Sequence, residues 1–185
     1  NGTVALRSQI AALYDGATDR NILATSGGIE ANFLACWSLL EPGDEVVLMV
    51  PNYQQIEGLT PAFGATLVRW EMKPDWNHGH WAADLDELRS LVNDRTRLIA
   101  ICNPNNPTGA TFDETWLDEV AAIAGRAWIL SDEIYAGAEL NGQPTPSMWG
   151  RHERVIVTNS LSKAYGLPGL RLGWAATSAD KASEL

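Results

Sequence analysis

Basic residues are scarce in this chain of 185 residues, which carries 13 lysines and arginines against 23 aspartates and glutamates and a net charge of −10. Nucleic acids and anionic membranes attract clusters of lysine and arginine, and the sequence has no basic run. No apolar stretch approaches the roughly 18–20 residues that a transmembrane helix needs, and no signal peptide opens the chain. We therefore expect neither a nucleic acid nor a membrane as a partner.

Cysteine is equally scarce. The two thiols, Cys36 and Cys102, lie far apart in apolar stretches, which predicts a reducing, cytoplasmic location rather than a disulfide scaffold. No metal site is expected, because His78 and His80 have no further histidine or cysteine nearby and a zinc site needs three or four ligands. At 45% hydrophobic and 19% charged, the chain has the composition of one well-packed globular domain.

Short apolar runs alternate with helical patterns along the chain. The predicted strands are Ile22–Thr25, Glu45–Val50, Ala65–Trp70, Leu98–Cys102, Ala127–Leu130, Val155–Thr158 and Gly173–Thr177. The predicted helices are Ile29–Leu40, Gln54–Phe63, Leu85–Val92, Glu114–Ala124 and a start at Ala179. This alternation predicts an α/β domain with a mostly parallel, seven-stranded sheet and helices on both faces. Lys73–Trp81 is the longest irregular stretch, and we expect a surface loop there.

Four polar clusters directly follow predicted strands, at residues 26–28, 103–109, 131–135 and 159–163. Ligands of open parallel sheets bind beyond the carboxyl ends of the strands. Chance explains one or two clusters at such places but not four. We therefore expect the four clusters to border one crevice.

Lys163 and Asp132 are the two side chains in these clusters best placed for chemistry. Lys163 is one of only three lysines and follows an apolar strand, where a buried amine near cations is available for Schiff-base chemistry. Asp132 needs a cationic partner if it is buried, and a pyridinium nitrogen would serve. Glu133 competes with it, but strand alternation points Glu133 to the other face. A solvated lysine and a helix-capping aspartate are the plain alternatives.

An anion-binding end is expected near Ser26-Gly27-Gly28, which lies between a strand and a helix. Helix N-termini favour anions and glycine permits close approach. Arg171 follows a stiff Gly-Leu-Pro-Gly-Leu turn and suits phosphate binding. The proline-rich loop 103–109 is rigid enough to position a hydrogen bond. Tyr135 could add a second one, and Tyr53 could lie against a flat heteroaromatic ligand.

Three strings of the sequence resemble the class I/II aminotransferases, which are pyridoxal-phosphate (PLP) enzymes of the aspartate-aminotransferase-like fold type I. They are Asn-Pro-Asn-Asn-Pro-Thr-Gly at 103–109, Ser-Asp-Glu-Ile-Tyr at 131–135 and Ser-Leu-Ser-Lys-Ala-Tyr-Gly-Leu-Pro-Gly-Leu-Arg-Leu-Gly-Trp at 160–174. All three occur in the family's order and at similar spacing, and the last one is highly specific. The resemblance covers essentially the whole chain.

The resemblance implies a role for each site residue. Catalysis falls to Lys163, as the Schiff-base lysine, to Asp132, which pairs with the pyridine nitrogen, and to Tyr135. The cofactor-binding residues that it implies are Gly27, Gly28, Ile29, Tyr53, Asn106, Asp132, Tyr135, Ser160, Ser162, Lys163 and Arg171. Among these, Asn106 and Tyr135 bind the phenolic oxygen of PLP, and Ser160, Arg171 and the backbone at 27–29 hold the phosphate, with Ser162 as a weaker candidate.

The resemblance also implies the reaction and the assembly. An aminotransferase moves an amino group between an amino acid and a 2-oxo acid. The chain begins at Asn1 without methionine and ends in a helical pattern. We therefore expect residues 1–185 to be the PLP-binding large domain of a longer protein, truncated at both ends and without its small domain. The full-length protein is expected to be a homodimer.

Several other functions are compatible with parts of the sequence. A C-S β-lyase, a decarboxylase or a racemase uses the same cofactor core, and a transcriptional regulator can carry a PLP-binding domain of this kind. Ser160 and Lys163 also fit the Ser-x-x-Lys motif of serine β-lactamases. That motif needs Ser-Asp-Asn and Lys-Thr-Gly further along, and neither occurs.

Overall fold

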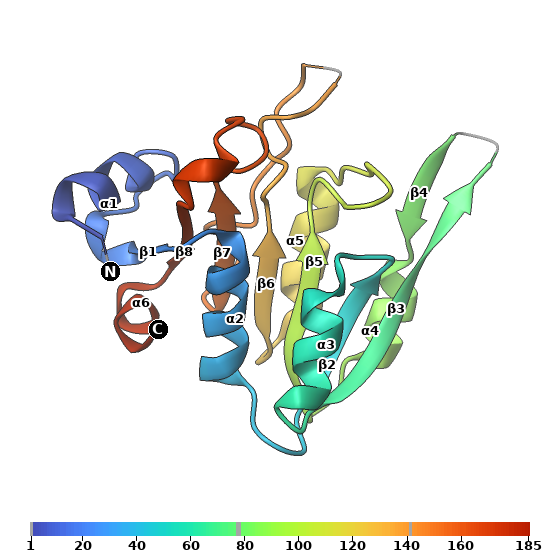
Figure 1. The fold of residues 1–185 in the computed structure, drawn as a ribbon. Helices are drawn as coiled ribbons and strands as arrows, with labels where there is room; N and C mark the ends of the chain where they lie inside the picture. Colours follow the sequence, from blue (N-terminus) through green and yellow to red (C-terminus); the bar gives the residue numbers. More distant parts are fainter. Residues whose placement is uncertain (1, 77–78, 141) are drawn as a thin grey trace.

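An eight-stranded sheet forms the centre of the protein, with helices on both faces (Figure 1). The structure, a computed structural model, describes residues 2–76, 79–140 and 142–185. The strands are β1 (Ile22–Thr25), β2 (Glu45–Val50), β3 (Thr66–Asp75), β4 (His80–Ala83), β5 (Thr96–Cys102), β6 (Trp128–Asp132), β7 (Val155–Ser160) and β8 (Gly173–Thr177). The helices are α1 (Val4–Ala11), α2 (Gly28–Leu39), α3 (Gln54–Ala62), α4 (Leu85–Leu91), α5 (Glu114–Ala124) and α6 (Ala179–Glu184). Two short 3-10 turns are η1 (Asp19–Asn21) and η2 (Pro168–Leu170).

The strand order is β1-β8-β7-β6-β5-β2-β3-β4. Strands β3, β2, β5, β6 and β7 are parallel, whereas β8 runs antiparallel to β7 and β1 antiparallel to β8. β1 therefore runs in the same direction as β7. As a result, the carboxyl ends of β1, β2, β5, β6 and β7 all lie along one edge of the sheet.

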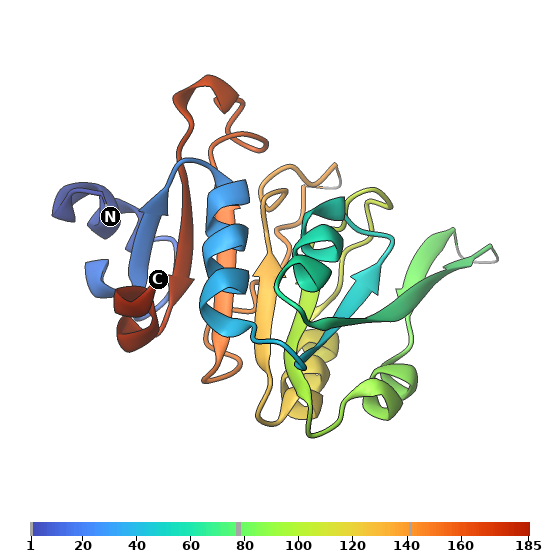
Figure 2. The same ribbon diagram turned by 60° about the horizontal axis from the view of Figure 1, so that its bottom comes forward.

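Two apolar layers cover the sheet, one on each face. Helices α2 and α3 pack on one face around Leu39, Leu48, Leu98 and Ile156. Helices α1, α4 and α5 lie on the other face, as Figures 1 and 2 show from two directions. The central strands are buried on both sides, which explains their nearly continuous apolar sequence. Of the helices that the structure describes, none has both the length and the apolar character needed to cross a membrane.

The predicted fold class is confirmed, with differences at two places. β3 continues to Asp75 and pairs antiparallel with β4, so the loop expected at Lys73–Trp81 is instead largely a hairpin and the sheet has an eighth strand. Met72 and Ala83, which stand opposite each other in this pairing, are buried at its base. His78 lies outside the described residues. α1 was also not predicted.

Gly173 allows the loop between β1 and α2 to lie against the sheet. This buried residue begins β8 and is in register with Thr25 of β1 and Ser160 of β7. The chain turns from β1 into α2 directly over it, with Gly27 at a positive φ of 98°. A Cβ at position 173 would lie 2.7 Å from the Cα of Gly27 and closer still to neighbouring backbone atoms. Only glycine allows this contact.

Replacing Gly173 by alanine is therefore expected to destabilise the full-length protein by about 1–3 kcal/mol, the usual cost of overpacking. Gly58 of α3 is the matched control, because a Cβ there meets no atom within 4 Å and alanine is the better helix former. Urea unfolding of the two variants tests this. A G173A midpoint equal to or above that of G58A would show that the loop does not depend on the contact.

Candidate active site

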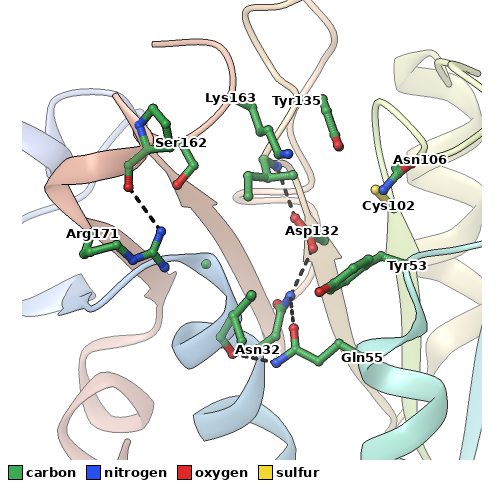
Figure 3. Close-up of a pocket in the computed structure, with 14 residues that line it drawn as sticks. Asn32, Tyr53, Gln55, Cys102, Asn106, Asp132, Tyr135, Ser162, Lys163 and Arg171 are labelled. Carbon is green, nitrogen blue, oxygen red and sulfur yellow. Dashed lines mark hydrogen bonds between the residues drawn. The ribbon is translucent and has the colours of Figure 1, made fainter. Parts of the chain in front are cut away.

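A cavity of about 270 Å³ opens at the edge of the sheet where the parallel strands end. This volume is just below the roughly 300–1,000 Å³ that small-ligand sites have. The residues that line it are Gly28, Ile29, Asn32, Tyr53, Gln55, Cys102, Asn106, Asp132, Ile134, Tyr135, Ser162, Lys163, Pro168 and Arg171. Each of the four polar clusters contributes at least one of them. Figure 3 shows their side chains arranged around one space.

Asp132 ends β6 and lines the cavity. Its Oδ2 accepts a hydrogen bond from Asn32 Nδ2 (3.0 Å), and its Oδ1 accepts one from the backbone N–H of Ile134 (3.1 Å). Burial raises the pKa of the Asp132 carboxyl, and these two hydrogen bonds lower it only in part. No ion pair among the described residues involves Asp132. The carboxylate therefore accepts hydrogen bonds from two neutral donors and forms no ion pair with any described residue.

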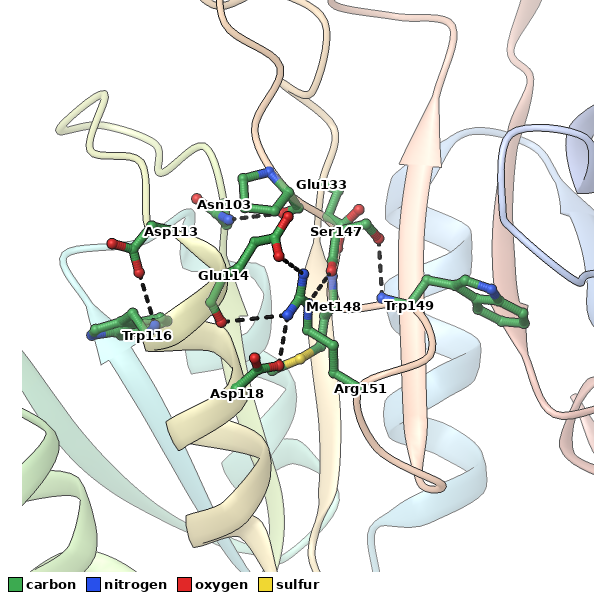
Figure 4. A network of polar contacts seen from close by, with 11 residues as sticks. Asn103, Asp113, Glu114, Trp116, Asp118, Glu133, Ser147, Met148, Trp149 and Arg151 are labelled. Atoms are coloured by element: carbon green, nitrogen blue, oxygen red, sulfur yellow. Dashed lines mark hydrogen bonds and ion pairs between the residues drawn. The ribbon is translucent and has the colours of Figure 1, made fainter.

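Glu133 points to the opposite face of the sheet, as strand alternation predicts. It is 3% exposed, and its Oε1 accepts hydrogen bonds from Ser131 Oγ and the backbone N–H of Met148, both 2.9 Å long. Figure 4 shows it close to Ser147 and Met148. Asn103, which follows β5, donates from its Nδ2 to the carbonyl of Pro146 (3.3 Å). Segment 145–151, which contains Pro146 and Met148, is thereby bonded to the residues that follow both β5 and β6.

Arg151 fixes the far end of this bracing segment. Its Nε donates to the carbonyl of Ser147 (2.9 Å), and its Nη1 reaches the Asp118 carboxylate of α5 (2.6 Å). A second ion pair, 3.7 Å long, joins it to Glu114 (Figure 4). The segment 145–151 is thus attached to the sheet at one end and to α5 at the other.

Lys163 lies in the turn after β7, in the same cavity as Asp132 (Figure 3). Its Nζ is 5.6 Å from the centre of the Tyr135 ring, within the range of a cation–π contact. The side chain is exposed, so the burial expected of this amine is not found among the described residues. The polar turn leaves Lys163 at the open side of the cavity, where none of the residues that the structure describes covers it.

Arg171 occupies the end of the cavity nearest the start of α2 (Figure 3). It is the only non-glycine residue with positive φ (49°) among those the structure describes, a backbone strain that is common at functional sites. Its Nη2 donates to the carbonyl of Ser26 (3.2 Å), and its Nη1 donates to that of Pro168 (3.2 Å). Gly27 does not line the cavity, but a Cβ there would collide with the guanidinium. The turn and the absence of a side chain at Gly27 together let the Arg171 guanidinium lie at the cavity.

The two serines of this region occupy different places. Ser162 lines the cavity. Ser160 is fully buried behind it, and its Oγ accepts a hydrogen bond from the backbone N–H of Ser162 (3.1 Å). Of the two, Ser162 is therefore the one that reaches the cavity wall.

Tyr53 and Asn106 form the side of the cavity opposite Arg171 (Figure 3). Tyr53 precedes α3 as its N-cap residue and is 50% exposed. The loop that carries Asn106 is fixed by its neighbour Asn105, whose Nδ2 donates to the carbonyl of Pro51 (3.3 Å) and whose Oδ1 accepts from Thr108 Oγ1 (2.7 Å). This accounts for the rigidity expected of the loop.

Sequence reasoning missed three polar or polarisable residues of the cavity: Asn32, Gln55 and Cys102. Asn32 had a detectable signal, because it is a polar residue on the helix face that buries Ala31, Ala35, Cys36 and Leu39. Cys102 ends β5 in register with Asp132, a pairing that the sequence alone does not specify. Gln55 has no local signal.

The geometry defines an α/β protein with a polar cavity at the carboxyl ends of a parallel sheet. The family model for aminotransferase class I and II matches residues 1–185. The chain therefore belongs to this family, and the resemblance drawn from the sequence is confirmed.

Similar proteins of known name and structure agree with this membership. Capreomycidine synthase of Streptomyces vinaceus is 37% identical over 186 residues, which is 100% of this chain and 47% of that protein. The aromatic amino acid aminotransferase of Rhodococcus opacus is 34% identical over 95% of this chain and 48% of its own length. The structure of a PLP-dependent aminotransferase from Streptococcus suis has a TM-score of 0.91 and 39% identity, over 99% of this chain and 48% of that one.

N-succinyldiaminopimelate aminotransferase of Mycobacterium tuberculosis gives a TM-score of 0.91 at 32% identity, over 99% of this chain and 50% of that structure. The chain thus spans about half the length of the relatives that it matches. The part that is matched includes every element on which the cavity is built.

The buried carboxyl of Glu133 should make stability depend on pH. Burial raises its pKa from 4.5 to about 7, and the pKa of Asp132 is raised as well. The folded state then binds more protons than the unfolded state between these values, so the free energy of unfolding falls as pH rises from 4.5 to 7. For Glu133 alone the loss is on the order of 3 kcal/mol.

Urea unfolding of the cofactor-free protein at a series of pH values measures this slope. Glu133→Gln retains an oxygen that accepts from Ser131 and Met148 but does not titrate, so it should flatten the dependence. A slope in E133Q as steep as that of the unmodified protein would contradict the assignment.

Proposed function

We propose that residues 1–185 form the PLP-binding large domain of a longer aminotransferase, which moves an amino group between an amino acid and a 2-oxo acid. The observation that supports this most is the arrangement of one amine, Lys163, and one unpaired carboxylate, Asp132, in a single cavity. The family membership of the chain gives independent support. Aminotransferases are among the relatives by name, and the matched region is the one that carries the cavity.

The donors around the cavity fit the chemistry of pyridoxal 5'-phosphate. Arg171, Ser162 and the start of α2 offer a cation and hydrogen-bond donors for the phosphate. Asp132 offers the carboxylate that a protonated pyridine nitrogen needs. Asn106 and Tyr135 are donors on the side opposite Arg171, suited to the phenolic oxygen, and Tyr53 offers a flat face for the ring. Gly27 and Ser160 act behind the cavity wall, through Arg171 and Ser162.

Bound PLP supplies an electron sink for the carbanion that forms at the substrate's α-carbon. The residues of the chain supply the rest. Lys163 would hold the cofactor through its amine. The same amine would serve as general base and acid at the substrate's α-carbon. The Asp132 carboxylate would stabilise a positive charge on the ring nitrogen.

The rest of the longer protein completes the site in this account. Lys163 and Tyr53 are exposed here. In the full-length protein, a small domain and the second subunit of a homodimer would cover them and exclude water from the site. The substrates are assigned only as an amino acid and a 2-oxo acid, and the location as the cytoplasm. The named aminotransferases among the relatives favour transamination over the lyase, decarboxylase, racemase and regulator alternatives.

Replacing Lys163 by alanine in the full-length protein should abolish the visible absorption of the lysine-bound cofactor and lower kcat by at least about a thousandfold, because the general base is lost. Lys73→Ala is the matched control, since Lys73 is an exposed lysine of the β3–β4 hairpin and pairs with Glu87. Absorption spectra and turnover with a panel of amino donors and oxo acids provide the measurement. Normal turnover in K163A would refute the assignment.

Asp132→Asn should retain part of the cofactor binding but lower kcat by at least about a hundredfold, because an amide does not hold the charge of a protonated ring. The dissociation constant for PLP and the turnover number are measured on the same preparation. If kcat in D132N equals that of the unmodified enzyme, Asp132 has no catalytic role.

A further inference from the structure

Asn32 lies in an unusual position for a polar residue. It is 3% exposed and stands on the buried face of α2, among small and apolar side chains. Burying an amide costs free energy unless its donors and acceptor find partners. The amide of Asn32 has hydrogen-bond partners for both its nitrogen and its oxygen, and one of them is the carboxylate of Asp132.

We infer that Asn32 is a positioning residue that holds the Asp132 carboxylate in place and favours its charged form toward the cofactor ring, an inference that rests on the proposed function. Asn32 itself is not assigned a contact with the ring.

The contacts of the Asn32 amide fix its orientation. Its Nδ2 donates to Asp132 Oδ2 (3.0 Å) and, over a longer distance, to Gln55 Oε1 (3.4 Å), while its Oδ1 accepts from Thr158 Oγ1 (2.7 Å). If the amide were turned over, its oxygen would face the oxygens of Asp132 and Gln55. Gln55 is held in turn, because its Nε2 donates to the carbonyl of Ile29 (2.6 Å).

The sheet and α2 together produce this arrangement (Figure 3). Thr158 of β7 stands in register with Asp132 of β6, so the two side chains lie next to each other on the same face of the sheet. Helix α2 packs on that face and places the Asn32 amide against both. Thr158 is fully buried, and no water competes for its hydroxyl there.

The electrostatic consequence follows from the environment of Asp132. Burial favours the neutral carboxylic acid, and the hydrogen bond from Asn32 opposes this more than the backbone N–H of Ile134 does. A hydrogen bond donated to a carboxylate stabilises its charged form. Without Asn32, a proton shared between the ring nitrogen and Asp132 moves toward the carboxyl, and the ring loses its positive charge.

Three substitutions in the full-length protein test this inference. Asn32→Leu keeps the number and branching of the side chain's heavy atoms and removes the amide donor and acceptor. Thr158→Val removes the hydroxyl that orients Asn32. Thr60→Val is the matched control, because Thr60 is also fully buried and its hydroxyl donates a single hydrogen bond, to the carbonyl of Ile56 (2.8 Å) away from Asp132.

The main readout is the ¹⁵N NMR signal of PLP labelled in its ring nitrogen, at pH 7. In N32L the signal should move toward that of neutral pyridine, and the dissociation constant for PLP should rise about tenfold, the effect of losing one hydrogen bond to a charged group. T158V should show smaller changes in the same direction, and T60V none. A folded N32L with the unmodified signal overturns the inference; if N32L does not fold, T158V behaving like T60V overturns it.

A second readout separates this inference from the proposed function. In the cofactor-free protein, ¹³C NMR of the Asp132 carboxyl should show a higher pKa in N32L and T158V than in T60V. If the unmodified protein does not bind PLP, the proposed function fails, and this titration still decides the role of Asn32. An Asp132 pKa that is the same in all three variants overturns that role.

Discussion

The site depends on one carboxylate, that of Asp132, which lies at the end of a central strand with no cation beside it among the described residues. Burial raises its pKa, and the two hydrogen bonds that it accepts come from neutral groups. A buried charge of this kind is stabilised when a positive group enters the cavity. The protonated pyridine nitrogen of PLP would be that group. With the nitrogen at Asp132, the phosphate would lie toward Arg171 and the aldehyde carbon toward Lys163.

The parallel sheet makes that placement possible. Five strands end at one edge, so residues separated by more than a hundred positions in sequence meet around a cavity of about 270 Å³. Behind the cavity, the lack of a side chain at Gly173 allows the loop that carries Gly27 to pack closely. On the opposite face of the sheet, segment 145–151, which Glu133 and Arg151 anchor, supports the ends of β5 and β6. The side chains that face the ligand are therefore held by contacts on both faces of the sheet.

Much of this could be predicted from the sequence, because the signals are local. Strands such as β2 and β5 are continuous apolar runs, and the polar cluster after each strand marks the edge where ligands bind. The β3–β4 hairpin was missed because the irregular, polar stretch 73–81 carries no clear strand pattern. The other differences depend on packing: Ser160 is buried behind Ser162, and Lys163 is exposed among the described residues. The polar Asn32 on the buried face of α2 was detectable, but its role was not, because its partners Asp132 and Thr158 are 100 and 126 residues away.

A crystal structure of the full-length protein with PLP bound tests the central claim most directly. The account predicts that the ring nitrogen lies about 2.6–3.2 Å from a carboxylate oxygen of Asp132, that the cofactor is bonded to Nζ of Lys163, and that Arg171 contacts the phosphate. A cofactor bonded to another lysine, or a ring nitrogen turned away from Asp132, would contradict it.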